Sequence, residues 1–315
     1  MPLDSMKALS QVPPREWSSK QLRRLGECLR DGREPPAGHP SYEDVVGWFD
    51  DLAAAVSSDI RSLAWDRLLP GGAAPQITSR AKTIDTLRDK LRRDPATPLP
   101  SIQDVAGVRL ECEMSLEEQD IVAATVASAF DCGPDTIRDL RDGSHAGYRG
   151  VHVWLRLPHG RAEVQVRTHL QGEWANTYEA LADWLGRQIR YGDLPDDPAL
   201  ADVVKDLQVL STATGASLEE VRLGLATVGR GLVTLRQQID SAIQRSPHLH
   251  DTVEARNSRQ RSKETRRRIS REELSPARSA APLRLLEDAY TQTLRALHET
   301  FVAARDRGDR SWPDF

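Results

Sequence analysis

Three short segments of this chain alternate strictly between polar and apolar residues. In the clearest of them, Glu163, Gln165 and Arg167 project from one side of an extended chain, while valines project from the other. The same alternation runs through residues 151–157 and 108–113. Each segment alone would fit a strand whose polar side faces water. If the three strands lie in one sheet, however, their ionisable sides form a single charged floor, which suits a site for a nucleotide and a metal ion.

Length, charge and cysteine content narrow the class of protein. The chain has 315 residues, a net charge of -4, 29% charged and 39% hydrophobic residues, and no apolar run as long as a membrane span. Its first residues lack the basic and apolar regions of an export signal, so we expect a cytoplasmic protein with no membrane partner. Cys28, Cys112 and Cys132 lie far apart and form no metal-binding pair, which predicts reduced thiols and no zinc site.

Hydrophobic periodicity predicts a mixture of helices and strands. Strands are expected near 105–112, 151–157 and 162–168. Helices are expected over 21–29, 42–69 as one helix or a pair, 83–93, 117–130, 168–185, 199–244 with an interruption at Thr214-Gly215, and 283–302. Helices before, between and after strands indicate an α/β (α+β) fold in which helices flank one sheet.

Composition divides the chain into five predicted parts. These are an N-terminal extension of uncertain order over 1–40, a mixed α/β domain over 41–195, helices over 196–250, a basic linker over 251–280 and a C-terminal helix over 281–315. The linker is marked by eight Lys or Arg residues between Arg256 and Arg271, against the single acidic residue Glu264.

Four short motifs follow one another along the mixed domain. They are Arg80-x-Lys82 with Thr86 and Lys90 behind it, Asp104-Val105-Ala106-Gly107-Val108-Arg109, Gly147-Tyr148-Arg149-Gly150-Val151-His152, and the Glu163 strand. This ordered set resembles the synthetase domain of the RelA/SpoT family, whose members make (p)ppGpp by moving a pyrophosphate from ATP to GDP or GTP. The resemblance covers about residues 76–185 and implies a nucleotidyltransferase-like mixed β-sheet flanked by helices.

The resemblance assigns the first motif to the donor nucleotide. Arg80, Lys82, Thr86 and Lys90 would hold ATP, because guanidinium and ammonium groups neutralise a triphosphate and orient it for attack. The alternative is a solvated helix face on which carboxylates and guanidinium groups pair with one another, formed by Asp85, Arg88, Asp89, Arg92 and Arg93.

The resemblance also implies a magnesium site and an acceptor site. Asp104 and Glu163 would bind Mg²⁺, and Glu163 would accept the proton of the attacking 3′-hydroxyl. Tyr148 resembles the tyrosine that stacks on the acceptor guanine. His152 corresponds to the family histidine of the same motif, which implies a catalytic role, and it shares the face of Glu163 if the hairpin loop has an even length. Residues that bind phosphate or orient the carboxylates would complete the floor: Arg109, Gln165 and Arg167.

Several functions stay open at this point. The residues before Ile77 contain one histidine, His39, so we expect no hydrolase domain and a small, synthetase-only member. Toxins of the same fold act on the 3′ end of tRNA, others make the adenosine counterpart of the alarmone, and a catalytically inactive regulatory or RNA-binding module is a third interpretation. A tRNA substrate would favour a basic surface near the site, supplied by the linker or by Arg23, Arg24, Arg30 and Arg33. An antitoxin partner and a homo-oligomer also stay open.

Overall fold

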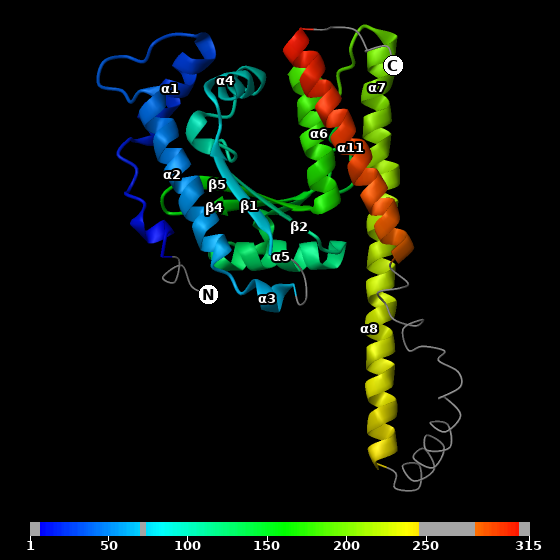
Figure 1. The fold of residues 1–315 in the computed structure, drawn as a ribbon. Coiled ribbons are helices and arrows are strands. Elements are labelled where there is room, and N and C mark those ends of the chain that lie inside the picture. The colour runs from blue at the N-terminus through cyan, green and yellow to red at the C-terminus, as the bar shows by residue number, and fades with distance from the viewer. Residues whose placement is uncertain (1–6, 70–73, 246–280, 309–315) are drawn as a thin grey trace.

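A five-stranded mixed sheet lies at the centre of the computed structural model, which describes residues 7–69, 74–245 and 281–308 (Figure 1). The strands are β1 (Gln76–Ala81), β2 (Ala106–Cys112), β3 (Ile137–Asp139), β4 (Val151–Arg156) and β5 (Arg161–Thr168), in the order β1-β2-β5-β4-β3. β2 and β5 run parallel and the other neighbouring pairs run antiparallel. The predicted mixed sheet flanked by helices is therefore confirmed.

The two outer strands of this sheet were not predicted from the sequence. Ile77 is the one buried apolar side chain among those described in β1, and β3 has only three residues, none of them buried. Neither edge strand therefore shows the repeated alternation by which the three inner strands were recognised. The sheet is consequently wider than the polar pattern indicated.

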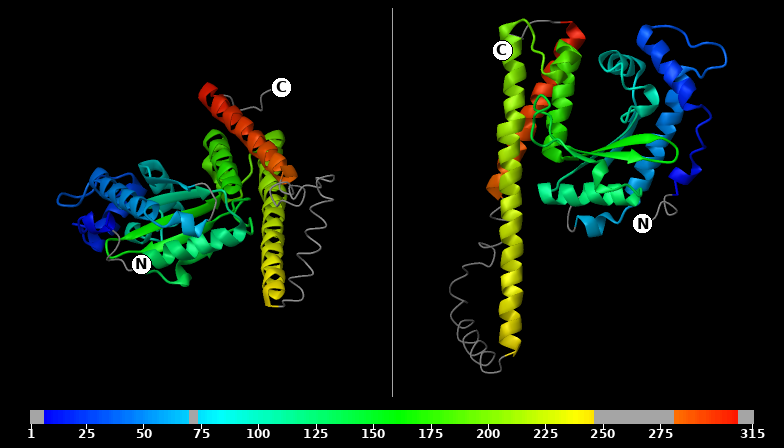
Figure 2. Two further views of the ribbon diagram at one scale, coloured as in Figure 1. Left: turned by 60° about the horizontal axis from the view of Figure 1, so that its bottom comes forward. Right: turned by 180° about the vertical axis from the view of Figure 1, so that it is seen from behind.

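One face of the sheet is apolar and forms the main core. Val108, Val164 and Val153 are direct neighbours across β2, β5 and β4, and none has exposed surface. The helices α2 (Tyr42–Arg61) and α5 (Leu116–Ala129) bury this face (Figure 2). The polar side chains of the same strands are thereby directed to the opposite face, which carries the candidate site.

The N-terminal residues, whose order the sequence left uncertain, include the helix that was expected over 21–29. α1 (Ser19–Asp31) buries Leu22 and Leu25 and packs against α4 (Ile84–Arg93). The predicted segment 42–69 is a pair of helices, because α2 ends at Arg61 and a single turn, α3 (Trp65–Leu68), follows. α1 thus lies beside α4 and supports it (Figure 1).

The helices after the last strand build a second core. They are α6 (His169–Leu185), the short η5 (Arg187–Tyr191), α7 (Pro198–Val209), α8 (Ala216–Arg245) and α11 (Ala281–Arg307). The interruption predicted at Thr214-Gly215 is a π-helical turn, η6 (Leu210–Gly215), that joins α7 to α8. α8 extends well past the sheet, and α11 lies beside α6 (Figures 1 and 2).

Two further sequence expectations concern the basic linker and membrane-spanning helices. The predicted linker, including the basic run from Arg256 to Arg271, lies outside the described residues. No helix within the described ranges combines the length and apolar character needed to cross a bilayer.

Candidate functional site

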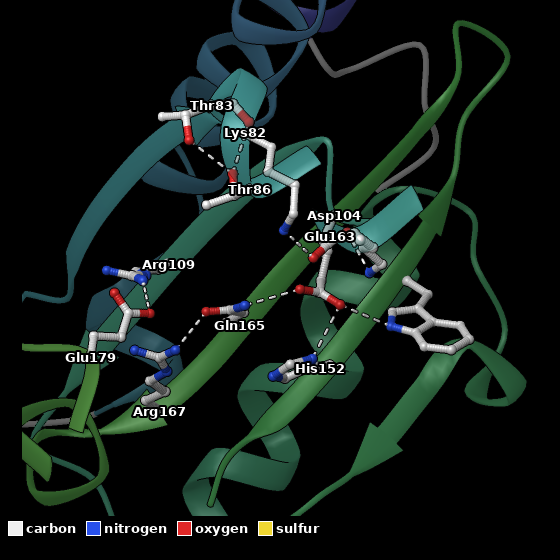
Figure 3. A network of polar contacts seen from close by, with 12 residues as sticks. Lys82, Thr83, Thr86, Asp104, Arg109, His152, Glu163, Gln165, Arg167 and Glu179 are labelled. Atoms are coloured by element: carbon white, nitrogen blue, oxygen red, sulfur yellow. Dashed lines mark hydrogen bonds and ion pairs between the residues drawn. The ribbon is translucent and has the colours of Figure 1, made fainter. Parts of the chain in front are cut away.

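The polar sides of the three inner strands form one continuous surface. Arg109 of β2, Gln165 of β5 and His152 of β4 are direct neighbours across the sheet, and Glu163 lies beside Trp154 in the next row (Figure 3). Direct cross-strand neighbours share a face, so the charged floor expected from the alternation is present. The hairpin between β4 and β5 also keeps His152 on the side of Glu163.

Asp104 links two lysines from different parts of the chain. Its Oδ2 accepts a hydrogen bond from Nζ of Lys82 at 2.6 Å, and its Oδ1 accepts one from Nζ of Lys90 on α4 at 2.7 Å. Burial raises the pKa of Asp104, but the two ammonium groups outweigh this effect and lower the pKa to about 2. Asp104 is therefore ionised at neutral pH.

Glu163 is buried and accepts hydrogen bonds from three side chains. Its Oε1 accepts from Nδ1 of His152 and from Nε1 of Trp154, both at 3.1 Å, and its Oε2 accepts from Nε2 of Gln165 at 2.9 Å. Burial raises the pKa of Glu163, but the adjacent imidazole outweighs burial and holds it below its ordinary value. The carboxylate is thus ionised and rigidly oriented.

These contacts close into a ring of five side chains, which we call the Glu163 ring: Glu163, His152, Tyr148, Arg167 and Gln165. Nε2 of His152 lies 2.7 Å from the Tyr148 hydroxyl, and Nε of Arg167 donates to the same oxygen at 3.2 Å. Nη2 of Arg167 then donates to Oε1 of Gln165 at 2.6 Å. Each member is oriented by two others, so the ring fixes the position of the Glu163 carboxylate.

The ring holds a proton on His152. Burial lowers the pKa of the imidazole, but the oxygens of Tyr148 and Glu163 outweigh burial and raise it to about 9. Burial likewise raises the pKa of the Tyr148 phenol, while Arg167 and His152 lower it below its ordinary value. His152 is therefore a cation at neutral pH and donates through both ring nitrogens.

A pocket of about 340 Å³ lies above this floor, between β1, α4 and η5. Seven of the predicted site residues line it: Lys82, Thr86, Lys90, Asp104, Arg109, Glu163 and Gln165. His152, Tyr148 and Arg167 stand outside the lining and reach the pocket through the Glu163 ring. The side chain of Arg80 lies outside the described part of the chain.

Two pocket residues are held by partners that the sequence did not indicate. Nη2 of Arg109 donates to Oε1 of Glu179 on α6 at 2.6 Å. The hydroxyl of Thr86 donates to the carbonyl oxygen of Thr83 at 2.8 Å, at the start of α4. A carboxylate on α6 thus orients Arg109, and a carbonyl group in the N-terminal turn of α4 orients Thr86 (Figure 3).

The sequence also allowed a solvated face of paired charges on the helix over 83–93. Such a face is present on α4, but on the side other than the one that carries Lys90. Arg88 pairs with Asp85 at 3.2 Å, and Nε of Arg92 donates to the carbonyl oxygen of Arg30 at 3.0 Å. Lys90 points instead to Asp104 and the pocket. One helix therefore carries both a surface ion pair and a pocket cation.

The pocket mouth contains residues that the sequence analysis missed. The guanidinium carbon of Arg93 lies 3.7 Å from the centroid of the Tyr191 ring, and Arg187 lies 3.9 Å from the carboxylate of Asp89. These contacts connect α4 to η5 across the pocket. No short motif marks η5, because its residues reach the pocket only after α6 has returned the chain over the sheet. The missed lining residues on α4 and η5 include Arg93, Arg187, Arg190 and Tyr191.

The sequence of the chain matches a known family over this site. Residues 79–184 match the family described as "Region found in RelA / SpoT proteins". The chain is also 50% identical over 202 residues to the uncharacterized proteins Rv1366 of Mycobacterium tuberculosis and Mb1401 of Mycobacterium bovis, which covers 64% of this chain and 71% of each relative. The chain belongs to the RelA/SpoT family, and the matched region contains strands β2 to β5 and the predicted site residues from Arg80 to Arg167.

Further relatives are more distant. The GTP pyrophosphokinase YjbM of Bacillus subtilis is 28% identical over 119 residues, which covers 33% of this chain and 54% of that protein. The crystal structure of small alarmone synthetase 1 from Bacillus subtilis is 22% identical with a TM-score of 0.45, covering 61% of this chain and 97% of that chain.

Proposed function

We propose that this protein is a Mg²⁺-dependent pyrophosphokinase, which transfers the pyrophosphate of ATP to the 3′-hydroxyl of GDP or GTP and so makes (p)ppGpp. The observation that carries the proposal is the pocket in which Asp104 and Glu163 face Lys82 and Lys90, in a chain of this family. The resemblance to a GTP pyrophosphokinase supports the choice of a guanosine acceptor.

The cations of the pocket suit the triphosphate of ATP. Lys82 and Lys90 are partly exposed to the pocket and already hold one anion, the carboxylate of Asp104. Phosphate oxygens that enter the pocket compete for both ammonium groups, and the exchange frees the oxygens of Asp104. Arg109 and Arg187 add planar guanidinium groups, which bind phosphate through two parallel hydrogen bonds.

The two carboxylates fit a magnesium ion that is shared with the nucleotide. In the described residues no three His, Cys, Asp or Glu side chains gather in a metal-binding group, so most ligands would come from phosphate and water. Such a ligand set is typical of Mg²⁺, which binds one or two protein carboxylates together with substrate oxygens. Oε2 of Glu163 accepts only the Gln165 hydrogen bond among the contacts described, so it keeps a lone pair for such an ion. Magnesium held there would neutralise the charge of the transferred group.

The members of the Glu163 ring have distinct roles in the proposed reaction. In the proposed reaction the 3′-oxygen bonds to the β-phosphorus of ATP, the bond from that phosphorus to the α-phosphate oxygen breaks, and AMP leaves. Glu163 is ionised and accepts the hydroxyl proton, whereas His152 already carries a proton and orients the carboxylate. Tyr148 lies at the far side of the ring, where its loop would meet the acceptor base.

The test is to incubate the purified protein with γ-³²P-labelled ATP and Mg²⁺, offering GDP, GTP or deacylated tRNA separately. Glu163→Gln keeps the shape of the side chain but loses its charge, and should lower product formation by about 100-fold or more. Glu117→Gln is the matched control, because Glu117 pairs with Arg230 on an exposed surface. Wild-type label in a guanosine product that is retained by Glu117→Gln and lost in Glu163→Gln is the expected result.

Other outcomes would overturn the proposal in defined ways. Label in tRNA alone would make the protein a tRNA-modifying toxin, and no label in any acceptor would favour an inactive regulatory or RNA-binding module. Three of the four N-terminal arginines considered for a tRNA surface have carboxylate partners, since Arg24 pairs with Glu27 while Arg30 and Arg33 both pair with Asp31. We therefore keep tRNA as an outcome of the test.

A further inference from the structure

A buried carboxylate on α8 reaches the neighbours of the Glu163 ring. Glu219 is 2% exposed, and its Oε2 lies 2.6 Å from Nη1 of Arg149. Its Oε1 accepts a hydrogen bond from the hydroxyl of Thr168. Arg149 follows Tyr148 in the chain and Thr168 follows Arg167, so Glu219 contacts the residues next to two members of the ring.

Tyr148 lies in the loop between β3 and β4, residues 140–150, which we call the Tyr148 loop. This loop also packs against the C-terminal helices at two glycines. A Cβ atom on Gly143 would lie 2.4 Å from Cγ2 of Thr212 in η6, and one on Gly147 would lie 3.0 Å from Cα of Gln208 in α7. Both glycines have positive φ angles, of +74° and +81°. The loop is therefore clamped by α7, η6 and α8 rather than by the sheet alone.

The Glu219–Arg149 pair differs from the surface ion pairs of the chain. Its two side chains are 2% and 7% exposed, so neither charge can be satisfied by water if the other is removed. Nε of Arg149 donates to the carbonyl oxygen of Arg141 at 2.9 Å, which ties the two ends of the same loop together. Loss of the Glu219 charge would remove the carboxylate that contacts Arg149 at 2.6 Å and would loosen the loop.

We propose that Glu219 is a positioning residue for the acceptor side of the site. It acts through Arg149 and Thr168 and holds the Tyr148 loop in the orientation that the Glu163 ring requires. The inference rests on the proposed function, because acceptor use is the property it would alter. Glu219 does not line the pocket that contains Lys82 and Lys90, so donor binding should not depend on it.

Glu219→Gln tests this inference with Glu287→Gln as its control. Glu287 forms a partly buried pair with Arg222, at 2.6 Å and with side chains that are 8% and 27% exposed, but this pair joins α8 to α11 and does not touch the loop. We expect Glu219→Gln to raise KM for the guanosine acceptor, or lower kcat, by about 10- to 100-fold while KM for ATP stays within about twofold. Equal changes in both KM values, or the same changes in Glu287→Gln, would mean that Glu219 is only structural.

Hydrogen exchange supplies a readout that does not need activity. The amide of Tyr148 donates to the carbonyl oxygen of His145 and that of Gly147 to Gly143, both within the loop. These amides should exchange faster in Glu219→Gln than in Glu287→Gln, and Glu219→Asp, which keeps the charge, should restore part of the protection. Unchanged exchange in a folded Glu219→Gln protein contradicts the positioning role, whereas a wild type without transferase activity contradicts only the proposed function.

Discussion

Lys82 donates a hydrogen bond to Asp104 at 2.6 Å, so a cation proposed to bind ATP already has an anionic partner in the pocket. The same carboxylate holds Lys90 at 2.7 Å, which keeps two mutually repelling ammonium groups close together. In the proposed function, a nucleotide phosphate would replace the Asp104 carboxylate as the partner of the two ammonium groups. The cations would then already be in place. The pairing therefore prepares the pocket for an anion of higher charge.

Lys90→Met should weaken the binding of ATP. The methionine fills similar volume but removes one of the two ammonium groups, so we expect KM for ATP to rise by about 10- to 100-fold with a smaller effect on the acceptor. Arg92→Met is the matched control, since Arg92 lies on the same helix and donates to the carbonyl oxygen of Arg30 instead. Equal KM values for ATP in Lys90→Met and wild type would remove Lys90 from the donor site.

The Asp104 pairs should contribute stability that is sensitive to acid. The pKa of Asp104 is lowered to about 2, so its stabilising effect is present above its ordinary pKa of about 3.9 and is lost as the pH falls through about 2. Urea unfolding of the wild type and of the double variant Lys82→Met/Lys90→Met should therefore diverge above about pH 4 and converge toward about pH 2. Curves that stay parallel over this range would contradict the pairing.

His152 should show the opposite dependence on pH. Its pKa is raised to about 9, so its contribution is fully present below the ordinary pKa of about 6.5 and is lost as the pH rises through about 9. NMR titration of the His152 ring protons should give a midpoint near the raised value in the wild type. In Glu163→Gln the midpoint should move down, because the carboxylate that holds the proton is gone. A wild-type midpoint near 6.5 would contradict a protonated His152.

Trp154→Phe should disturb Glu163 without touching the pocket cations. The change removes the Nε1–H that donates to Oε1 of Glu163, so the free energy of unfolding should fall by about 1–3 kcal/mol. Transferase activity should fall several-fold as the carboxylate loses one of its three orienting contacts. Trp65→Phe serves as the control, because Nε1 of Trp65 donates to the carbonyl oxygen of Ile60 away from the site. Equal losses of activity in the two variants would show that the Glu163 contact has no special role.

The inner part of the site could be predicted because it rests on local patterns. Alternation alone placed Glu163, Gln165 and Arg167 on one face, and the same rule placed His152 and Trp154 beside them once the hairpin length was even. Helical spacing put Thr86 and Lys90 on one side of α4, and both line the pocket. In each case the side-chain direction follows from the backbone period.

The rest of the site could not be predicted because it depends on distant contacts. The link from Arg109 to Glu179 joins residues separated by 70 positions, and the η5 residues reach the pocket only through the packing of α6. The edge strand β1 also escaped prediction, since Ile77, the one buried side chain among those described in it, gives no period. The helix over 21–29 was predicted and corresponds to α1, but its packing against α4 depends on a contact between segments far apart in the chain.

The strand order determines the stage of synthesis at which the candidate site is completed. β5 is the last strand to leave the ribosome, yet it lies between β2 and β4 in the finished sheet. A nascent chain that stops before β5 contains Lys82, Lys90 and Asp104 but has neither Glu163 nor a complete sheet to support them. In the proposed function, capture of nucleotide and the ability to react with it would therefore arise together, when the final strand is inserted.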